Sequence, residues 1–197
     1  MSRQDTVYQV RITLENSEPP IWRRVQVKGD TSLADLHRII QIAMGWEDYH
    51  LYEFTVGKVV YMPSSPGDDF FMFDEKPQSV SRNTLESVTD GRRIKFQYVY
   101  DMGDDWTHAV KVEKTLAPEE GMAYPRCLAG ERACPPEDCG GVWGYEELLE
   151  ILSEPEHEAY GETLEWLGEG FDPENFDLDA VNKELARRFK RRSAKKG

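Results

Sequence analysis

The fold is decided by the stretch Arg93–Glu113, RIKFQYVYDMGDDWTHAVKVE, in which two alternating runs flank a short acidic turn. The residues that share one face of these runs are Ile94, Phe96, Tyr98 and Tyr100, and then Trp106, His108, Val110 and Val112. A period of two on both sides of a glycine-containing turn is typical of a β-hairpin. The apolar face is expected to be the core face, and its parity places His108 in the core.

The chain before this hairpin predicts two further hairpins and one helix. Alternation predicts strands over 7–14 and 21–28, joined by a loop that contains two prolines, and a second hairpin over 51–61. Apolar residues at helical spacing predict a helix over about 33–44. Thr31 or Ser32 can cap its start and Gly45 can end it. This order of elements resembles the start of a β-grasp fold.

The chain after the hairpin is predicted to be mainly helical. Helical spacing covers 145–152 and 156–167, and a last helix begins after Asp177 as its N-cap. The stretches 63–83 and 117–142 are rich in proline and glycine and are predicted to be irregular. We therefore predict an α+β fold: a mixed or antiparallel sheet of hairpins, one early helix and a helical C-terminal third. Residues 1–182 are predicted to form a single domain, followed by a basic end over 183–197.

Charge is spread unevenly along the chain. The protein has 24 Lys and Arg against 37 Asp and Glu, a net charge of −13. The segment 183–197 holds eight basic residues and one acid, or +7, so residues 1–182 carry −13 minus +7, which is −20. An acidic body of this kind repels phosphate backbones. We expect no nucleic-acid binding except through the basic C-terminal end, and the partner to be a protein or a small ligand.

Neither a membrane span nor a secretory signal is expected. No stretch of the sequence approaches the about 20 consecutive apolar residues that a spanning helix needs, and the N-terminus lacks the apolar core of a signal peptide. A cytoplasmic protein is the resulting prediction. The three cysteines do not suggest a disulfide framework, because they are few and odd in number.

The cysteines are the first candidate metal site. Cys127, Cys134 and Cys139 have the spacing C-x6-C-x4-C in a loop rich in proline and glycine. This is not a standard zinc-finger spacing, but three thiols with His108 or His50 as a fourth ligand would suit zinc. The alternative is that the cysteines are small buried apolar residues in a loop braced by its prolines.

Carboxylates around the same loop and the hairpin turn form the second candidate site. Its predicted members are Asp101, Asp104, Asp105, Glu137, Asp138 and His50, together with His108. Carboxylates with an imidazole can bind a hard metal or carry out acid–base chemistry. The alternative is structural, because aspartate and glycine are favoured in turns and His108 can be a core residue.

Four stretches together resemble one known family. They are Pro20–Val25 (PIWRRV), Tyr100–His108 (YDMGDDWTH), Cys127–Tyr145, and Phe171–Asp177 (FDPENFD). This combination resembles the plasmid pRiA4b ORF-3-like family, some of whose members are labelled as insertion-element passenger proteins with a resolvase-like name. The resemblance covers nearly the whole chain and implies an α+β domain. The family often has a second histidine two residues after position 50, where this chain has Tyr52.

The sequence thus predicts a binding or interaction module associated with mobile elements. Its ligand or metal site would join the central hairpin turn to the cysteine loop, and zinc is the candidate ion. The alternative is a metal-dependent hydrolase or nuclease-type enzyme that uses His108 and the nearby carboxylates. No catalytic residue and no organic cofactor site is assigned from the sequence.

Overall fold

The computed structural model of the protein describes residues 6–63, 76–168 and 170–193, with side chains up to Phe189. Residues 64–75 of the predicted irregular stretch 63–83, and residues 194–197 of the predicted basic end, lie outside the described residues.

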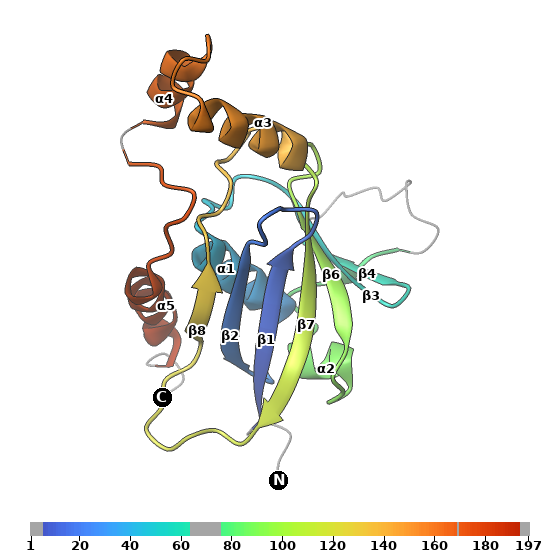
Figure 1. Ribbon diagram of the computed structural model, residues 1–197. Helices are drawn as coiled ribbons and strands as arrows, with labels where there is room; N and C mark the ends of the chain where they lie inside the picture. The colour runs from blue at the N-terminus through green and yellow to red at the C-terminus, as the bar shows by residue number, and fades with distance from the viewer. Residues whose placement is uncertain (1–5, 64–75, 169, 194–197) are drawn as a thin grey trace.

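Within the described residues, eight strands form one mixed sheet with the order β5-β4-β3-β6-β7-β1-β2-β8 (Figure 1). The strands are β1 (Val7–Leu14), β2 (Trp22–Lys28), β3 (Tyr52–Val56), β4 (Val59–Met62), β5 (Gln78–Ser79), β6 (Lys95–Tyr100), β7 (Trp106–Leu116) and β8 (Arg126–Glu131). All neighbours pair antiparallel except β4 and β5, which are parallel. The predicted α+β fold with a helical C-terminal third is confirmed.

The central hairpin has the predicted parity. β6 and β7 pair with Tyr98 opposite His108 and Tyr100 opposite Trp106. His108 and Trp106 are both fully buried, whereas Thr107 on the other face is partly exposed. The prediction that His108 points into the core is confirmed, because alternate residues of a strand face opposite sides of the sheet.

The helices are α1 (Leu33–Met44), α2 (Leu85–Thr89), α3 (Gly141–Ser153), α4 (Tyr160–Leu167) and α5 (Leu178–Ser193). The first of these, α1, packs its apolar stripe against one face of the sheet. Ser32 caps its start by accepting from the backbone N–H of Asp35, a contact that typically stabilises a helix by about 1 kcal/mol. Gly45 ends it with φ 109°, a conformation that glycine adopts without steric cost.

Four elements differ from the prediction, and the first is β5, which lies in the stretch 63–83 that was predicted to be irregular. The stretch 117–142 was predicted to be irregular, but β8 lies within it and pairs with β2. This strand is short and contains no β-branched residue, so its local signal is weak. The helix α3 begins at Gly141 rather than at 145, and α4 begins at Tyr160 rather than at 156 because turns occupy the residues after Pro155.

The outer edge of the sheet is covered by α5, which packs against β8 and α1. Asn182 lies on this helix and contacts the backbone of Cys127 in β8. Its Oδ1 accepts from the Cys127 N–H at 2.8 Å, and its Nδ2 donates to the Cys127 carbonyl at 2.9 Å. The side-chain amide therefore makes both hydrogen bonds that a neighbouring antiparallel residue would make.

Arg23 fixes the loop that follows β8. Its buried guanidinium donates to four backbone carbonyls, those of Ala43 at 2.6 Å and of Trp22, Glu131 and Arg132 at 2.8 Å each. The ring of Phe176 covers its face at 4.2 Å. These contacts tie the C-terminal end of α1 to the start of the cysteine loop, and they consume most of the donors that an arginine has.

Candidate functional site

A histidine and three carboxylates from three separate segments converge beside the central hairpin. The Nε2 atom of His50 lies 3.2 Å from Asp138 Oδ1 and 3.7 Å from both Asp101 Oδ2 and Glu137 Oε2. Of the residues that the structure describes, His50, Asp101 and Asp138 are the one group of three or more possible metal ligands whose atoms all lie within 4.8 Å of one another. These side chains bring the hairpin turn and the cysteine loop together.

Asp101 is oriented by the turn between β6 and β7. It adopts φ 56°, a left-handed conformation that aspartate tolerates better than most residues. Its backbone N–H donates to the carbonyl of Leu51, and its Oδ1 accepts from the N–H of Gly103 at 2.8 Å. One carboxylate oxygen is thereby held by the turn, and the other, Oδ2, faces His50.

Glu137 is oriented by hydrogen bonds to its first oxygen. Oε1 accepts from the backbone N–H of Glu47 at 2.9 Å and from the hydroxyl of Tyr100 at 3.1 Å. The Tyr100 hydroxyl itself accepts from the N–H of Tyr49. Burial raises the pKa of Tyr100, and the nearby Glu137 carboxylate raises it further, so the phenol stays protonated and can donate.

The Nε2 atom of His50 is buried and has no hydrogen bond of normal geometry, although its ring as a whole is partly exposed. A buried nitrogen without a partner is uncommon in folded proteins. Its surroundings are three carboxylates, of which Asp138 is the most exposed, with 71% of its side chain accessible. An imidazole nitrogen among carboxylate oxygens is a ligand set that divalent transition metals accept.

Two other acids predicted for the site, Asp104 and Asp105, make hydrogen bonds that stabilise the hairpin turn and its packing. Asp104 Oδ2 accepts from the N–H of Gly140 at 3.2 Å, which docks the hairpin turn on the end of the cysteine loop. Gly141 packs so closely there that a Cβ atom would lie 2.5 Å from the Asp104 carbonyl oxygen. Asp105 accepts from the hydroxyl of Thr107 and is exposed. Neither acid belongs to the group around His50.

His108 lies in the core, away from this group. Its ring packs edge-on against Trp46 at 5.2 Å and tilted against Tyr98 at 5.4 Å. Neither ring nitrogen makes a hydrogen bond of normal geometry. Burial lowers the pKa of His108 to about 4, partly offset by the backbones of Trp106 and Tyr98, so the ring is neutral at pH 7. A fully buried ring cannot reach a substrate in solution.

The cysteines are all free thiols. Cys127 is buried in β8, and its Sγ lies 3.5 Å from the carbonyl oxygens of Arg24 and Ala129. Burial raises the thiol pKa of Cys127, Cys134 and Cys139, which disfavours the thiolates that bind zinc. Among the described residues, these cysteines and His108 do not form a group of three ligand atoms as close as those around His50.

Comparison with known proteins identifies the chain. The sequence pattern of the plasmid pRiA4b ORF-3-like proteins matches residues 6–180. The chain belongs to this family. A family relative from Sinorhizobium fredii, the uncharacterized protein y4hQ, is 37% identical over 97% of this chain and 98% of its own length.

A solved structure has the same fold. The crystal structure of MM3350 from Methanosarcina mazei Go1, a protein of unknown function, covers 90% of this chain and 97% of its own with a TM-score of 0.80 and 42% identity. Neither relative's name states an activity, so the function of the site is argued from its geometry. No described helix combines the length and the apolar character that crossing a bilayer requires.

Sequence reasoning missed the residues that orient the site. Tyr100 was assigned to the core face, and its hydroxyl reaches Glu137 from there. Glu47 contributes through its backbone N–H, which no side-chain pattern can reveal. Both Glu47 and His50 lie in the loop over 46–51. The sequence of this loop is rich in polar and aromatic residues, and this composition was the one signal that could have pointed to its part in the site.

Proposed function

We propose that the protein is a binding module whose ligand site holds one divalent metal ion on His50, Asp101 and Asp138, with Glu137 as a further ligand. The observation that supports this most is the buried Nε2 atom of His50, which lacks a hydrogen bond and faces three carboxylates. A cation there would satisfy the nitrogen and reduce the repulsion between the carboxylates.

Zinc is the ion to test first. A site with one imidazole and two or three carboxylates suits zinc or manganese, whereas calcium and magnesium prefer oxygen ligands alone. The ligands come from the loop after α1, the hairpin turn and the cysteine loop, so a bound ion would fasten three segments together. The association with mobile elements stays a prediction.

The enzyme alternative receives less support. It relies on His108 together with the nearby carboxylates, and the His108 ring is fully buried between aromatic side chains. General acid–base catalysis needs a group within hydrogen-bond reach of the substrate. A binding role needs only the oriented ligands that the site offers.

Isothermal titration calorimetry with ZnCl₂, and separately with MnCl₂, tests the proposal on protein stripped of metal and free of an affinity tag. We expect one equivalent of zinc to bind, and His50→Gln to weaken the affinity by at least about tenfold. Asp101→Asn and Asp138→Asn should do the same. Asparagine tolerates the positive φ of both positions, so these variants keep the backbone.

Asp105→Asn is the matched control. It removes the same charge from the same turn, also at a position with positive φ, but outside the group. An equal loss of affinity in this variant would show that only the general negative charge of the turn attracts the ion. Absence of zinc and manganese binding by the unmodified protein would reject the site outright.

A further inference from the structure

A cleft of about 580 Å³ opens next to the candidate metal site. It lies between the C-terminal end of α1, the loop after β8, and the segment that leads from α4 into α5. Four aromatic side chains line it, Trp46, Trp166, Phe171 and Phe176. A cleft of this size and character suits a small molecule or one or two side chains of a partner.

The charge in this cleft is negative. Glu47, Glu137 and Asp177 line it, and Arg23 is the one cation among the described lining residues. The Arg23 guanidinium is buried, donates to four backbone carbonyls and is covered by Phe176. It is therefore poorly placed to bind an anion, and the acids determine which charge the cleft attracts.

We propose that the cleft receives a lysine or arginine side chain from a basic segment of another protein. The apolar stem of such a side chain would lie along the aromatic walls, and its head would be held by the ring faces and by Glu47 and Asp177. The protein carries −20 over residues 1–182, so its field steers a basic partner toward it.

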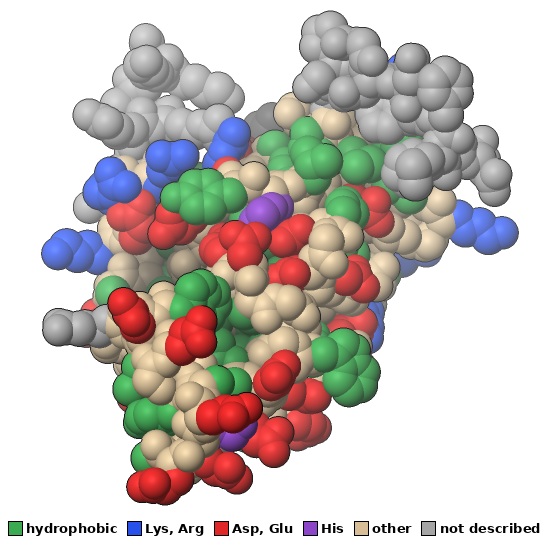
Figure 2. Space-filling model, turned by 90° about the horizontal axis from the view of Figure 1, so that it is seen from above, with side chains coloured by type: hydrophobic (Ala, Val, Ile, Leu, Met, Phe, Trp, Pro, Cys, Tyr) green, Lys and Arg blue, Asp and Glu red, His purple; other side chains and the backbone are tan. Residues whose placement is uncertain are grey.

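The surface around the cleft fits the same partner. Figure 2 shows Asp and Glu side chains spread over this end of the molecule, with hydrophobic side chains exposed between them. Trp166 is 53% exposed, although a large aromatic residue normally buries more of its surface. Nucleic acid is disfavoured by the charge, and an uncharged apolar peptide would bring no positive charge to the three carboxylates.

The inference goes beyond the metal site and does not depend on it. Glu137 is the one proposed metal ligand that also lines the cleft, and its Oε2 faces His50 while Oε1 accepts from the Tyr100 hydroxyl and the Glu47 backbone N–H. Because both oxygens of Glu137 already have neighbours, we assign the charged head group of the partner's lysine or arginine to Glu47 and Asp177. The experiment is run in a chelator, so its outcome says nothing for or against the bound ion.

The test is calorimetric titration of the full chain with acetylated and amidated tetra-arginine, in EDTA. We expect one peptide to bind per chain, with an affinity that falls as salt is raised. Acetylated tetra-glutamine should not bind measurably. Trp166→Ala and Asp177→Asn should each weaken tetra-arginine binding by about fivefold or more, the loss expected for one cation–π contact or one charge pair.

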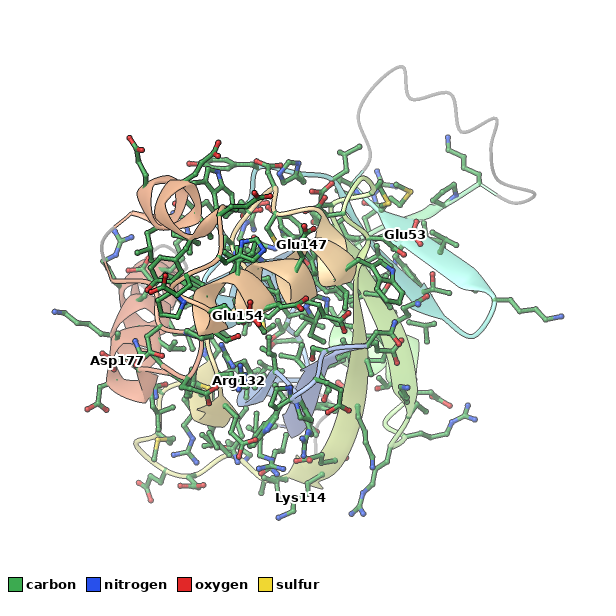
Figure 3. The ribbon with its side chains drawn as sticks, turned by 45° about the horizontal axis from the view of Figure 1, so that its top comes forward. Glu53, Lys114, Arg132, Glu147, Glu154 and Asp177 are labelled. Atoms are coloured by element: carbon green, nitrogen blue, oxygen red, sulfur yellow. The ribbon has the colours of Figure 1, made fainter. Side chains whose placement is uncertain are left out.

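Two substitutions on α3 are matched controls. Trp143→Ala removes an indole that is 83% exposed, and Glu147→Gln removes an acid on α3, whereas Asp177 directly precedes α5 (Figure 3). Asparagine at 177 can still cap α5, where Asp177 accepts from the N–H of Ala180. Both controls should bind tetra-arginine like the unmodified protein.

Three results would overturn the inference. Tetra-glutamine could bind as tightly as tetra-arginine, which would make the cleft a neutral peptide site. The α3 controls could lose as much affinity as the cleft variants, which would indicate attraction to the acidic body as a whole. Trp166→Ala and Asp177→Asn could both bind like the unmodified protein, which would place the peptide elsewhere.

Discussion

The hydroxyl of Tyr100 donates a hydrogen bond to Oε1 of Glu137 across 3.1 Å and joins the end of β6 to the cysteine loop. The two residues are 37 positions apart in the chain. Since Tyr100 belongs to the sheet, it supplies a rigid support for a carboxylate that lies on a loop. Residues that orient metal ligands in this way are often nearly as important to affinity as the ligands.

Tyr100→Phe removes this support and leaves every proposed ligand in place. We expect zinc affinity to fall by about tenfold, because Glu137 loses one of the hydrogen bonds that orient it. The free energy of unfolding should fall by about 1 kcal/mol, the usual value of one hydrogen bond. Calorimetry with zinc and urea denaturation measure the two effects.

Tyr52→Phe is the control for this substitution. Tyr52 pairs with Tyr100 across β3 and β6, but its ring stacks on His37 at 3.5 Å and its hydroxyl makes no hydrogen bond to Glu137. Zinc affinity should be unchanged in this variant. A Tyr100→Phe protein with the affinity of the unmodified one would mean that the loop backbone alone orients Glu137.

Because the ring of His108 is buried, we expect the folded state to lose stability on acidification. Its folded pKa is about 4 and lies below the ordinary value of 6.5, because burial disfavours the charged ring. Between these two pH values the unfolded chain binds more protons than the folded one, so stability falls as pH falls. The shift corresponds to roughly 3 kcal/mol from this residue.

His108→Leu should remove that part of the pH dependence. Urea denaturation at pH 7 and near pH 4 measures it, and the variant should lose less stability than the unmodified protein over this range. Some dependence should remain, because burial also lowers the pKa of His37 to about 4. At pH 7 the variant should be at least as stable, since two unpartnered nitrogens leave the core. An unchanged pH dependence would contradict the assignment.

The backbone at Gly141, where the hairpin turn packs on the start of α3, is predicted to require glycine. Gly141→Ala would place a Cβ atom 2.5 Å from the Asp104 carbonyl oxygen, on a backbone with φ 72°. We expect the free energy of unfolding to fall by about 2 kcal/mol or more, because the close contact and the left-handed backbone are both unfavourable for alanine. Urea denaturation measures this loss as a lower midpoint. The measurement also reports on the site, since Asp104 and Asp101 share the turn.

Gly161→Ala is the opposite case. Gly161 lies in α4, and a Cβ atom there would meet no atom within 4 Å. Alanine is the better helix former, so this variant should gain up to about 1 kcal/mol. Equal effects of the two substitutions would show that the close packing at Gly141 does not limit stability.

Much of the sheet followed from local patterns in the sequence. A period of two was enough to place His108 inside, and cap residues bounded α1 correctly. The strand β8 could not be found in this way, because its place is set by pairing with β2 across about a hundred residues rather than by its own alternation. Long-range pairing overrides weak local propensity.

The candidate site was only partly predictable for the same reason. The sequence named His50, Asp101 and Asp138 as candidates, but it grouped them with Asp104, Asp105 and His108. Composition shows which residues can bind a metal, and only the fold shows which of them meet. The left-handed turns at Asp101 and Asp138 decide this, because each redirects a carboxylate within one residue.

Asn182 has a consequence for assembly. An unpaired sheet edge is a template on which further chains can add strands, and many proteins must block it. Here the Asn182 amide occupies both outward hydrogen-bonding groups of Cys127, and α5 lies along the same edge. At Cys127, the hydrogen-bonding edge of β8 is therefore occupied by a side chain rather than by another strand. Polymerisation through β8 would first require α5 to detach.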